Sequence, residues 1–214
     1  QRGINITVKK KDQTLYETIN LATNSYNDLD LEEVPRMNLV HYVANDVLSS
    51  CLSRKIAGQL PIHNELENEI CDFLKTEDCL LATNGYIAQQ TTMFGLFRKS
   101  DVIFSDEYNH SSLVDGMRLS QAKIIVYPHL NYSKLEKLII KHRHKYNSAG
   151  IVSDGVFSAH GTVADLDQIH LLKTKYNLIS VIDDTHGFAT IGKNKRGVLD
   201  LFQSRPDVIT ASLA

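Results

Sequence analysis

The feature that most constrains the fold is an apolar run, residues 178–182, which ends in two carboxylates, an imidazole and a glycine. Its sequence, Leu-Ile-Ser-Val-Ile, alternates little between polar and apolar side chains, which is typical of a parallel strand covered on both faces. Asp183, Asp184 and His186 follow at once. Open α/β sheets bind ligands beyond the carboxyl ends of such strands. Asp and Gly after a strand are also common turn residues, so the motif alone fits a plain turn equally well.

Strand-like and helix-like segments alternate along the chain. We expect further strands at 79–82, 102–104, 123–127, 150–153 and 207–211, and helices at 61–74, 87–97, 132–146 and 166–176, with one more ending at Leu119. Short connections between such segments predict an α/β fold with a mainly parallel sheet. Polar or glycine residues follow the strands, so one sheet edge would gather them. They are Gly85, His110, Ser158, Asp183, His186 and Ser212.

Composition limits the class of ligand. The 214 residues are 43% hydrophobic and carry a net charge of -2, so one sizeable core is expected, and neither nucleic acid nor an anionic membrane is a favoured partner. A small molecule is the expected ligand. The three cysteines lack CxxC spacing, which disfavours a disulfide framework or a thiolate zinc site. We expect them to be reduced and mostly buried, in a cytoplasmic protein.

The N-terminal part differs in character from the rest. Residues 1–46 combine a lysine patch with the turn-forming segment 24–28 and are interpreted as an irregular arm, with residues 47–214 forming part of a larger domain. Small residues surround Arg54 in the stretch 49–58, which predicts a tight loop near a ligand. The chain opens with Gln1 and shows no leader, so an upstream segment is an open possibility.

Four segments resemble the motifs of one enzyme family. Residues 181–188, Val-Ile-Asp-Asp-Thr-His-Gly-Phe, are close to V-D-D-A-H-G, and residues 154–158, Asp-Gly-Val-Phe-Ser, are close to E-G-V-F-S. Residues 24–26 resemble the start of N-D-Y-L-G, and residues 53–67 resemble S-R-x-x-x-G-x-x-x-x-H-x-x-L-E. From about residue 21 to residue 214, the chain is similar to the α-oxoamine synthase family of pyridoxal-phosphate enzymes, which have fold type I.

The resemblance implies the large domain of a fold type I PLP-dependent transferase, with helices on both faces of the sheet, while the family's C-terminal small domain would lie outside this chain. It also implies pyridoxal 5'-phosphate as the cofactor and no metal. Asp183 would pair with the pyridine nitrogen, where a carboxylate favours the protonated ring. His186 and Ser158 would address the phenolic oxygen. His110 would stack on the ring.

The resemblance also assigns the phosphate and the substrate. The amides of Gly85 and Tyr86 and the hydroxyl of Ser212 would hold the phosphate, and Asn24 and Arg54 would bind the substrate. Independently of the resemblance, a strand that breaks at a glycine before a helix forms an anion cradle, because unpaired N–H groups and the helix dipole point outward. Without a complete phosphate-loop signature, that pattern alone is unspecific.

Three departures from the family motifs concern the substrate more than the cofactor. Residues 49–52 replace a glycine-rich run, residues 26–28 lack the usual Leu-Gly, and His160 stands where an acidic residue is common. The family's Schiff-base lysine follows a tripeptide that matches residues 212–214, where this sequence ends. We expect that lysine directly after residue 214 of a longer protein.

The activity that the resemblance implies is the condensation of an amino acid with an acyl thioester such as acyl-CoA, with decarboxylation, to give an α-amino ketone. A homodimer is expected, because the segments around Asn24 and Arg54 have too little apolar content to be core. Aminotransferase chemistry on the same fold is the close alternative. A metal-dependent hydrolase is a more distant one, with ligands drawn from Asp183, Asp184, His186, His110 and His160, although no HExxH spacing is present. A non-catalytic binding protein is the third.

Overall fold

The computed structural model describes residues 5–19, 23–24, 26, 32–46 and 49–213. The chain divides into two compact units, one up to residue 66 and the other from Glu67 to Leu213. Each unit is described by itself below. The sequence-based boundary between residues 46 and 47 stays a prediction.

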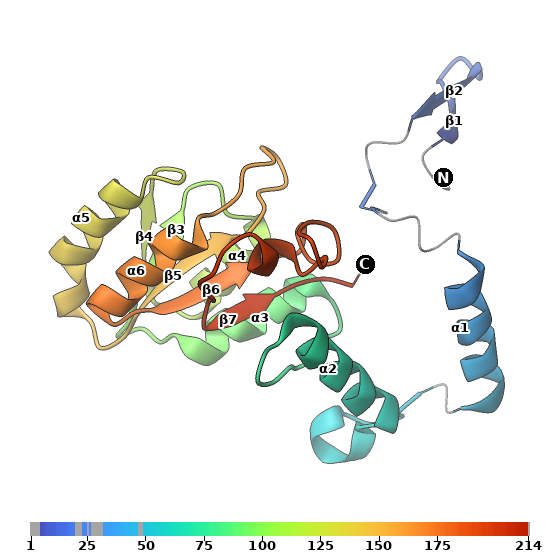
Figure 1. Cartoon of the computed structure of the whole chain (residues 1–214), viewed down its shortest axis with the longest axis horizontal. Coiled ribbons are helices and arrows are strands. Elements are labelled where there is room, and N and C mark those ends of the chain that lie inside the picture. Colours follow the sequence, from blue (N-terminus) through green and yellow to red (C-terminus); the bar gives the residue numbers. More distant parts are fainter. Residues whose placement is uncertain (1–4, 20–22, 25, 27–31, 47–48, 214) are drawn as a thin grey trace. The chain divides into compact units, whose positions relative to one another are not determined.

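The first unit contains regular structure, so the interpretation of its sequence as irregular was wrong. Strands β1 (Asn5–Lys9) and β2 (Leu15–Ile19) form an antiparallel pair, and helix α1 spans Glu33–Asn45 (Figure 1). The turn between the strands is closed by Asp12, whose Oδ1 accepts from Thr14 N at 3.0 Å. Arg54–Gly58 forms one turn of π-helix. The hairpin was missed because its two strands bury no residue, so their sequence carries no core-facing apolar pattern.

The second unit holds the predicted α/β pattern. Helix α2 (Pro61–Leu74) leads into it from the first unit. The elements that follow are α3 (Gly85–Leu96), β3 (Val102–Asp106), α4 (Ser111–Leu119), β4 (Lys123–Tyr127), α5 (Tyr132–His142), β5 (Ala149–Asp154), α6 (Leu166–Tyr176), β6 (Ile179–Asp183) and β7 (Val208–Thr210). Short 3-10 turns occupy Arg143–Lys145 and Gly197–Asp200.

The five strands form one parallel sheet in the order β4-β3-β5-β6-β7. From β3 the chain runs outward to β4 and then returns past β3 to β5, so the direction of winding reverses between β3 and β5. At such a reversal the loops after the two strands leave toward opposite faces and open a crevice at the carboxyl edge. The predicted mainly parallel sheet is confirmed.

Helices cover both faces of this sheet, as expected (Figure 1). Successive strand residues point to opposite faces. Phe104 belongs to the buried cluster that includes Leu135 of α5 and Leu166 of α6, whereas its neighbour Ile103 packs with Met93 of α3 and residues of α4. Burying one such side chain stabilises the fold by about 1.5–3 kcal/mol, so both helical layers hold the strand ends in place.

Two local predictions were wrong. Residues 79–82 are not a strand, because a strand needs a hydrogen-bonded neighbour and the described residues supply none there. Instead Leu81 N donates to Glu67 Oε1 at 2.9 Å, and Leu80 is 86% exposed. The cysteines are free, as expected, but not mostly buried, since Cys51 is exposed and the other two are half-buried.

Gly150 in β5 provides a test of the packing between β5 and α3. A Cβ at this position would overlap the buried ring of Phe97 and lie 3.3 Å from the Ile179 carbonyl oxygen. We expect Gly150→Ala to lower the free energy of unfolding by about 1–3 kcal/mol. The control is Gly95→Ala in α3, where a Cβ meets nothing within 4 Å and helix propensity favours alanine by about 1 kcal/mol. Urea denaturation measures both, and equal effects of the two substitutions would contradict this packing.

Candidate active site

Carboxylates gather at the carboxyl edge of the sheet. Asp106, Asp154 and Asp183 are the last residues of β3, β5 and β6, and all three are buried. Asp154 lies opposite Asp183 in the strand register, and Asp183 lies opposite Thr210 of β7. Buried carboxylates repel one another and cost free energy unless they are protonated, hydrogen-bonded or near positive charge. This edge is therefore prepared to receive a ligand with a positive or proton-bearing group.

Asp183 is oriented by the residue two positions after it. Its Oδ1 accepts hydrogen bonds from Thr185 N at 3.1 Å and from Thr185 Oγ1 at 2.6 Å. Burial raises the pKa of Asp183, while the bonds from Thr185 and the charges of His110 and His186 lower it. Both of these hydrogen bonds fall on Oδ1, and no described residue donates to Oδ2, which leaves that oxygen for a ligand.

Asp154 anchors the backbone that carries His110. Its Oδ1 accepts from His110 N at 3.2 Å, and its own N–H donates to Asn109 Oδ1 at 2.9 Å. Burial, together with the charges of Asp183 and Asp106, raises the pKa of Asp154 to about 7, although the hydrogen bond from His110 N lowers it. Asp154 was quoted in the sequence motif but assigned no role there.

The two predicted histidines lie around Asp183. His110 caps the N-terminus of α4, where its Nδ1 accepts from Ser112 N at 3.3 Å, and its ring is exposed. His186 follows Asp183 by three residues and is half-buried. Since both lower the pKa of Asp183, the structure brings His110, Asp183 and His186 to one place, as the sequence predicted.

The N-terminus of α3 lies beside the end of the β7 segment. Asn84 caps this helix by accepting from Ile87 N at 2.9 Å, and the N–H groups of Gly85 and Tyr86 have no acceptor among the described residues. A Cβ on Gly85 would lie 3.3 Å from Ser212 Cβ, so these two predicted residues are neighbours. Free N–H groups at a helix start beside a hydroxyl are a suitable site for a phosphate.

Asp184 is enclosed by protein atoms. It is fully buried, its Oδ2 accepts from Val198 N at 2.9 Å, and its buried Oδ1 has no hydrogen-bond partner among the described residues. Side chains at Gly155, Gly187 or Gly197 would all collide with its carboxyl group. Burial, together with the charge of Asp183, raises the pKa of Asp184 to about 7, although the hydrogen bond from Val198 N lowers it.

The surroundings of the remaining predicted residues do not test their roles. Ser158 is exposed in the loop after β5, and its hydroxyl forms no hydrogen bond with another described residue. The Tyr86 hydroxyl donates to Asp115 Oδ2 at 2.9 Å. In the first unit, Asn24 Oδ1 lies 3.4 Å from the Tyr26 hydroxyl, and Arg54 Nε donates to Gln59 Oε1 at 2.6 Å. The roles of all these residues stay predictions.

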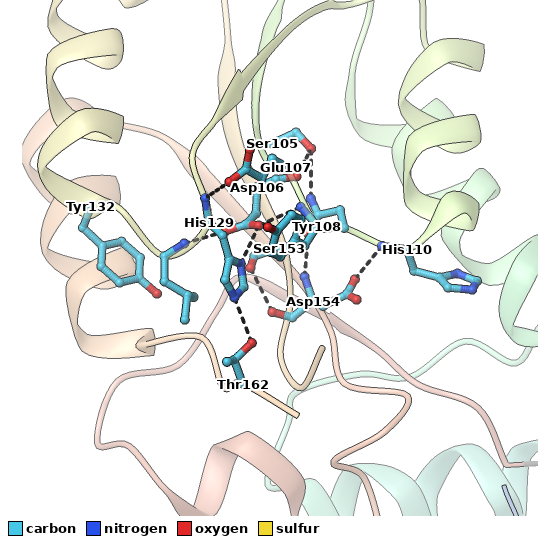
Figure 2. A network of polar contacts seen from close by, with 12 residues as sticks. Ser105, Asp106, Glu107, Tyr108, His110, His129, Tyr132, Ser153, Asp154 and Thr162 are labelled. Atoms are coloured by element: carbon cyan, nitrogen blue, oxygen red, sulfur yellow. Dashed lines mark hydrogen bonds and ion pairs between the residues drawn. The ribbon is translucent and has the colours of Figure 1, made fainter. Parts of the chain in front are cut away.

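A polar network beyond Asp154 was missed by the sequence reasoning (Figure 2). His129, in the loop after β4, contacts Asp106 through Nδ1 and Thr162 through Nε2. The partners are 23 and 33 residues away in the chain, so no local motif reveals them. The only available signal was the position of Asp106 and His129 after two expected strands.

Within the described ranges, no group of three or more His, Cys, Asp or Glu side chains is arranged to hold a metal ion. The search of the same residues for a helix that is long and apolar enough to span a membrane also found none.

The fold and this edge define the class of protein. A family model described as aminotransferase class I and II matches residues 16–214, so the chain belongs to that family. Its relatives include 8-amino-7-oxononanoate synthase of Coprothermobacter proteolyticus, which is 40% identical over 205 residues. That alignment covers 92% of this chain and 51% of the relative. The chain thus spans about half the length of the curated relatives it matches.

Solved structures give the same grouping. Serine palmitoyltransferase of Sphingomonas wittichii superposes with a TM-score of 0.81 at 25% identity, covering 86% of this chain and 46% of that one. An 8-amino-7-oxononanoate synthase from Francisella tularensis gives a TM-score of 0.70 at 26% identity over 86% of this chain and 50% of that one. Both are α-oxoamine synthases, so the family resemblance and the fold type I large domain that the sequence indicated are confirmed.

The environment of Asp184 predicts a pH-dependent stability. A carboxyl group whose folded pKa lies above its unfolded value of 3.8 contributes stability that is fully present below 3.8 and is lost as the pH rises through about 7. We expect Asp184→Asn to reduce the loss of unfolding free energy between pH 4.5 and pH 8 by on the order of 1–3 kcal/mol. Denaturant unfolding of the wild type and the variant at each pH measures this difference. Parallel pH profiles would show that Asp184 does not titrate in this range.

Proposed function

We propose that the protein containing this chain is a PLP-dependent acyltransferase of the α-oxoamine synthase type. It would join an amino acid to an acyl thioester such as acyl-CoA, release the thiol and carbon dioxide, and form an α-amino ketone. The observation that carries the proposal is the buried Asp183 at the carboxyl end of β6, whose hydrogen bonds from Thr185 both fall on Oδ1. The relatives of the chain are named 8-amino-7-oxononanoate synthase. A neighbour of the same fold, serine palmitoyltransferase, was solved with PLP.

The residues at this edge fit pyridoxal phosphate. Asp183 Oδ2 would meet the pyridine nitrogen, while Thr185 keeps the carboxylate in place and favours its ionised form. An ionised carboxylate at that nitrogen holds a proton on it. When bound, the cofactor supplies an electron-accepting ring that stabilises negative charge at the α-carbon of the amino acid.

The other groups at this edge would hold the cofactor in position. His110, whose backbone is fixed by Asp154, would cover the ring face, and His186 with Ser158 would address the phenolic oxygen. The N–H groups of Gly85 and Tyr86, with the Ser212 hydroxyl, would hold the phosphate, since the α3 N-terminus offers both donors and a favourable dipole.

Further parts of the proposal concern the whole protein. We propose a lysine directly after residue 214 as the residue that binds the cofactor covalently and moves the α-proton. Asn24 and Arg54 would bind the substrate, at a site completed in a homodimer. A cytoplasmic location fits the biosynthetic relatives.

Aminotransferase chemistry is the second candidate, because the family model carries that description and the same electron-accepting ring supports it. The names of the relatives favour acyl transfer.

The reaction can be tested on the full-length protein. We expect a visible absorbance band from bound cofactor that borohydride reduction abolishes, with the label mapping to the lysine after residue 214. Incubation with glycine, alanine or serine and a panel of acyl-CoAs should release thiol and carbon dioxide in equal amounts. Amino-group transfer to a keto acid without thiol release would instead make the protein an aminotransferase, and no cofactor band would overturn both readings.

The two adjacent aspartates provide a matched pair of variants. Asp183→Asn removes the charge at the pyridine nitrogen, so we expect the fold and much of the bound cofactor to remain while turnover falls about 100-fold or more. Asp184→Asn changes a carboxyl group that faces Val198 and three glycines, and turnover should fall less than tenfold. Steady-state kcat of both variants measures this, and equal losses would mean that the wrong carboxylate was assigned.

A further inference from the structure

Three side chains from separate segments form a continuous hydrogen-bonded line beside the proposed site (Figure 2). Asp106 Oδ1 lies 2.9 Å from His129 Nδ1, and His129 Nε2 lies 2.8 Å from Thr162 Oγ1. The Asp106 side chain is completely buried, and that of His129 is 15% exposed. The line connects the end of β3 to the loops that follow β4 and β5.

The backbone holds the Asp106 carboxylate in one orientation. Asp106 accepts from Tyr108 N through Oδ1 and from Leu130 N through Oδ2, each at 2.9 Å. A carboxylate accepts hydrogen bonds, so His129 Nδ1 is the donor to Asp106 Oδ1. The Thr162 hydroxyl can donate or accept, so it can complete the second bond with His129 Nε2 in either form of the ring.

Aromatic packing holds the His129 ring at this point. Its centroid lies 4.4 Å from that of Phe157 at an interplanar angle of 86°, and 4.6 Å from that of Tyr108. His160 stacks on the other neighbour, Tyr108, at 4.3 Å and 7°. Phe157 and His160 belong to the loop after β5, so His129 and Tyr108 together form the surface on which that loop packs.

The segment on this surface is a short hairpin, residues 156–163, which we call the 156–163 hairpin. It is closed by the bridge between Val156 and Val163 and by the bond from Phe157 N to Thr162 O at 2.9 Å. A two-stranded piece of this length is not stable by itself. Its exposed tip carries Ser158, so the position of that residue depends on what ties the hairpin down.

We propose that His129 is a positioning residue: held by Asp106, it binds the Thr162 hydroxyl and fixes the 156–163 hairpin so that Ser158 stays at the cofactor edge of the sheet. This inference rests on the proposed function, in which Ser158 addresses the phenolic oxygen. It adds an assignment for Asp106, His129 and Thr162, none of which contacts the cofactor in that proposal.

The first test does not use activity. Thr162→Val keeps the shape of the side chain but removes the hydroxyl, whereas Thr162→Ser keeps it. In the cofactor-free full-length protein, we expect amide hydrogen exchange in the 156–163 hairpin to be about tenfold faster in Thr162→Val, and close to wild type in Thr162→Ser. Exchange in α6 should not change in either variant. Wild-type protection in Thr162→Val would overturn the role of His129.

The second test asks whether the effect passes through Ser158. In the cofactor-loaded protein, Thr162→Val should lower kcat about tenfold and shift the pH titration of the cofactor's absorbance, with Thr162→Ser restoring both. In a Ser158→Ala background, the same substitution should change neither quantity, because the group it positions is gone. Equal losses in both backgrounds would leave Thr162 a merely structural residue and overturn the inference.

The two tests separate the inference from the proposed function. If the wild type binds no cofactor, the proposed function fails and Ser158 loses its assigned role, while the exchange experiment still decides whether His129 fixes the hairpin. If the wild type binds cofactor and forms the amino ketone but the double-mutant cycle is additive, the proposed function stands and the inference fails.

Discussion

The reversal of winding between β3 and β5 is the constraint on which the rest of the second unit depends. Because α4 leaves β3 toward one face and α6 follows β5 on the other, the two loops diverge and the carboxyl edge stays open between them. His110 reaches this edge from the first loop and Ser158 from the second. Asp154, at the end of β5, ties the two sides together through the His110 backbone. The divergence of the two loops thus follows from strand order, and the chemistry of the edge follows from the residues at the strand ends.

Buried strands and amphipathic helices could be predicted closely from the sequence, because the spacing of apolar residues within each segment indicates which face packs against the core. The helix at Leu166–Tyr176 and the strand at Lys123–Tyr127 have the expected bounds. The strand at 79–82 was wrong because strand formation needs a neighbour that the segment itself does not encode. The N-terminal hairpin and α1 were missed as well. Helix α1 buries no residue, so its sequence shows no apolar face from which a helix could be predicted.

The candidate site could be predicted where its residues are close together in the sequence, and it could not be predicted where they are far apart. Asp183, Thr185 and His186 lie within one short motif, and a motif can be compared with a family. Asp183 and Asp184 have the same chemistry in sequence, and only their surroundings separate a carboxylate at an open edge from one enclosed by Val198 and glycines. His129 contacts residues that are distant in the chain, so its connection to Asp106 and Thr162 required the fold.

The burial of two carboxylates at this edge costs free energy, and this cost indicates which kind of ligand the edge can bind. Asp154 and Asp183 end neighbouring strands, and burial raises the pKa of both, so the folded chain pays free energy to keep them ionised. A ligand that brings a protonated nitrogen to Asp183 removes part of that penalty, and by linkage it stabilises the folded state as it binds. Thr185, His110 and His186 lower the pKa of Asp183 in advance. These three groups oppose the effect of burial before a ligand arrives, and such fixed groups are what electrostatic catalysis requires of a preorganised site.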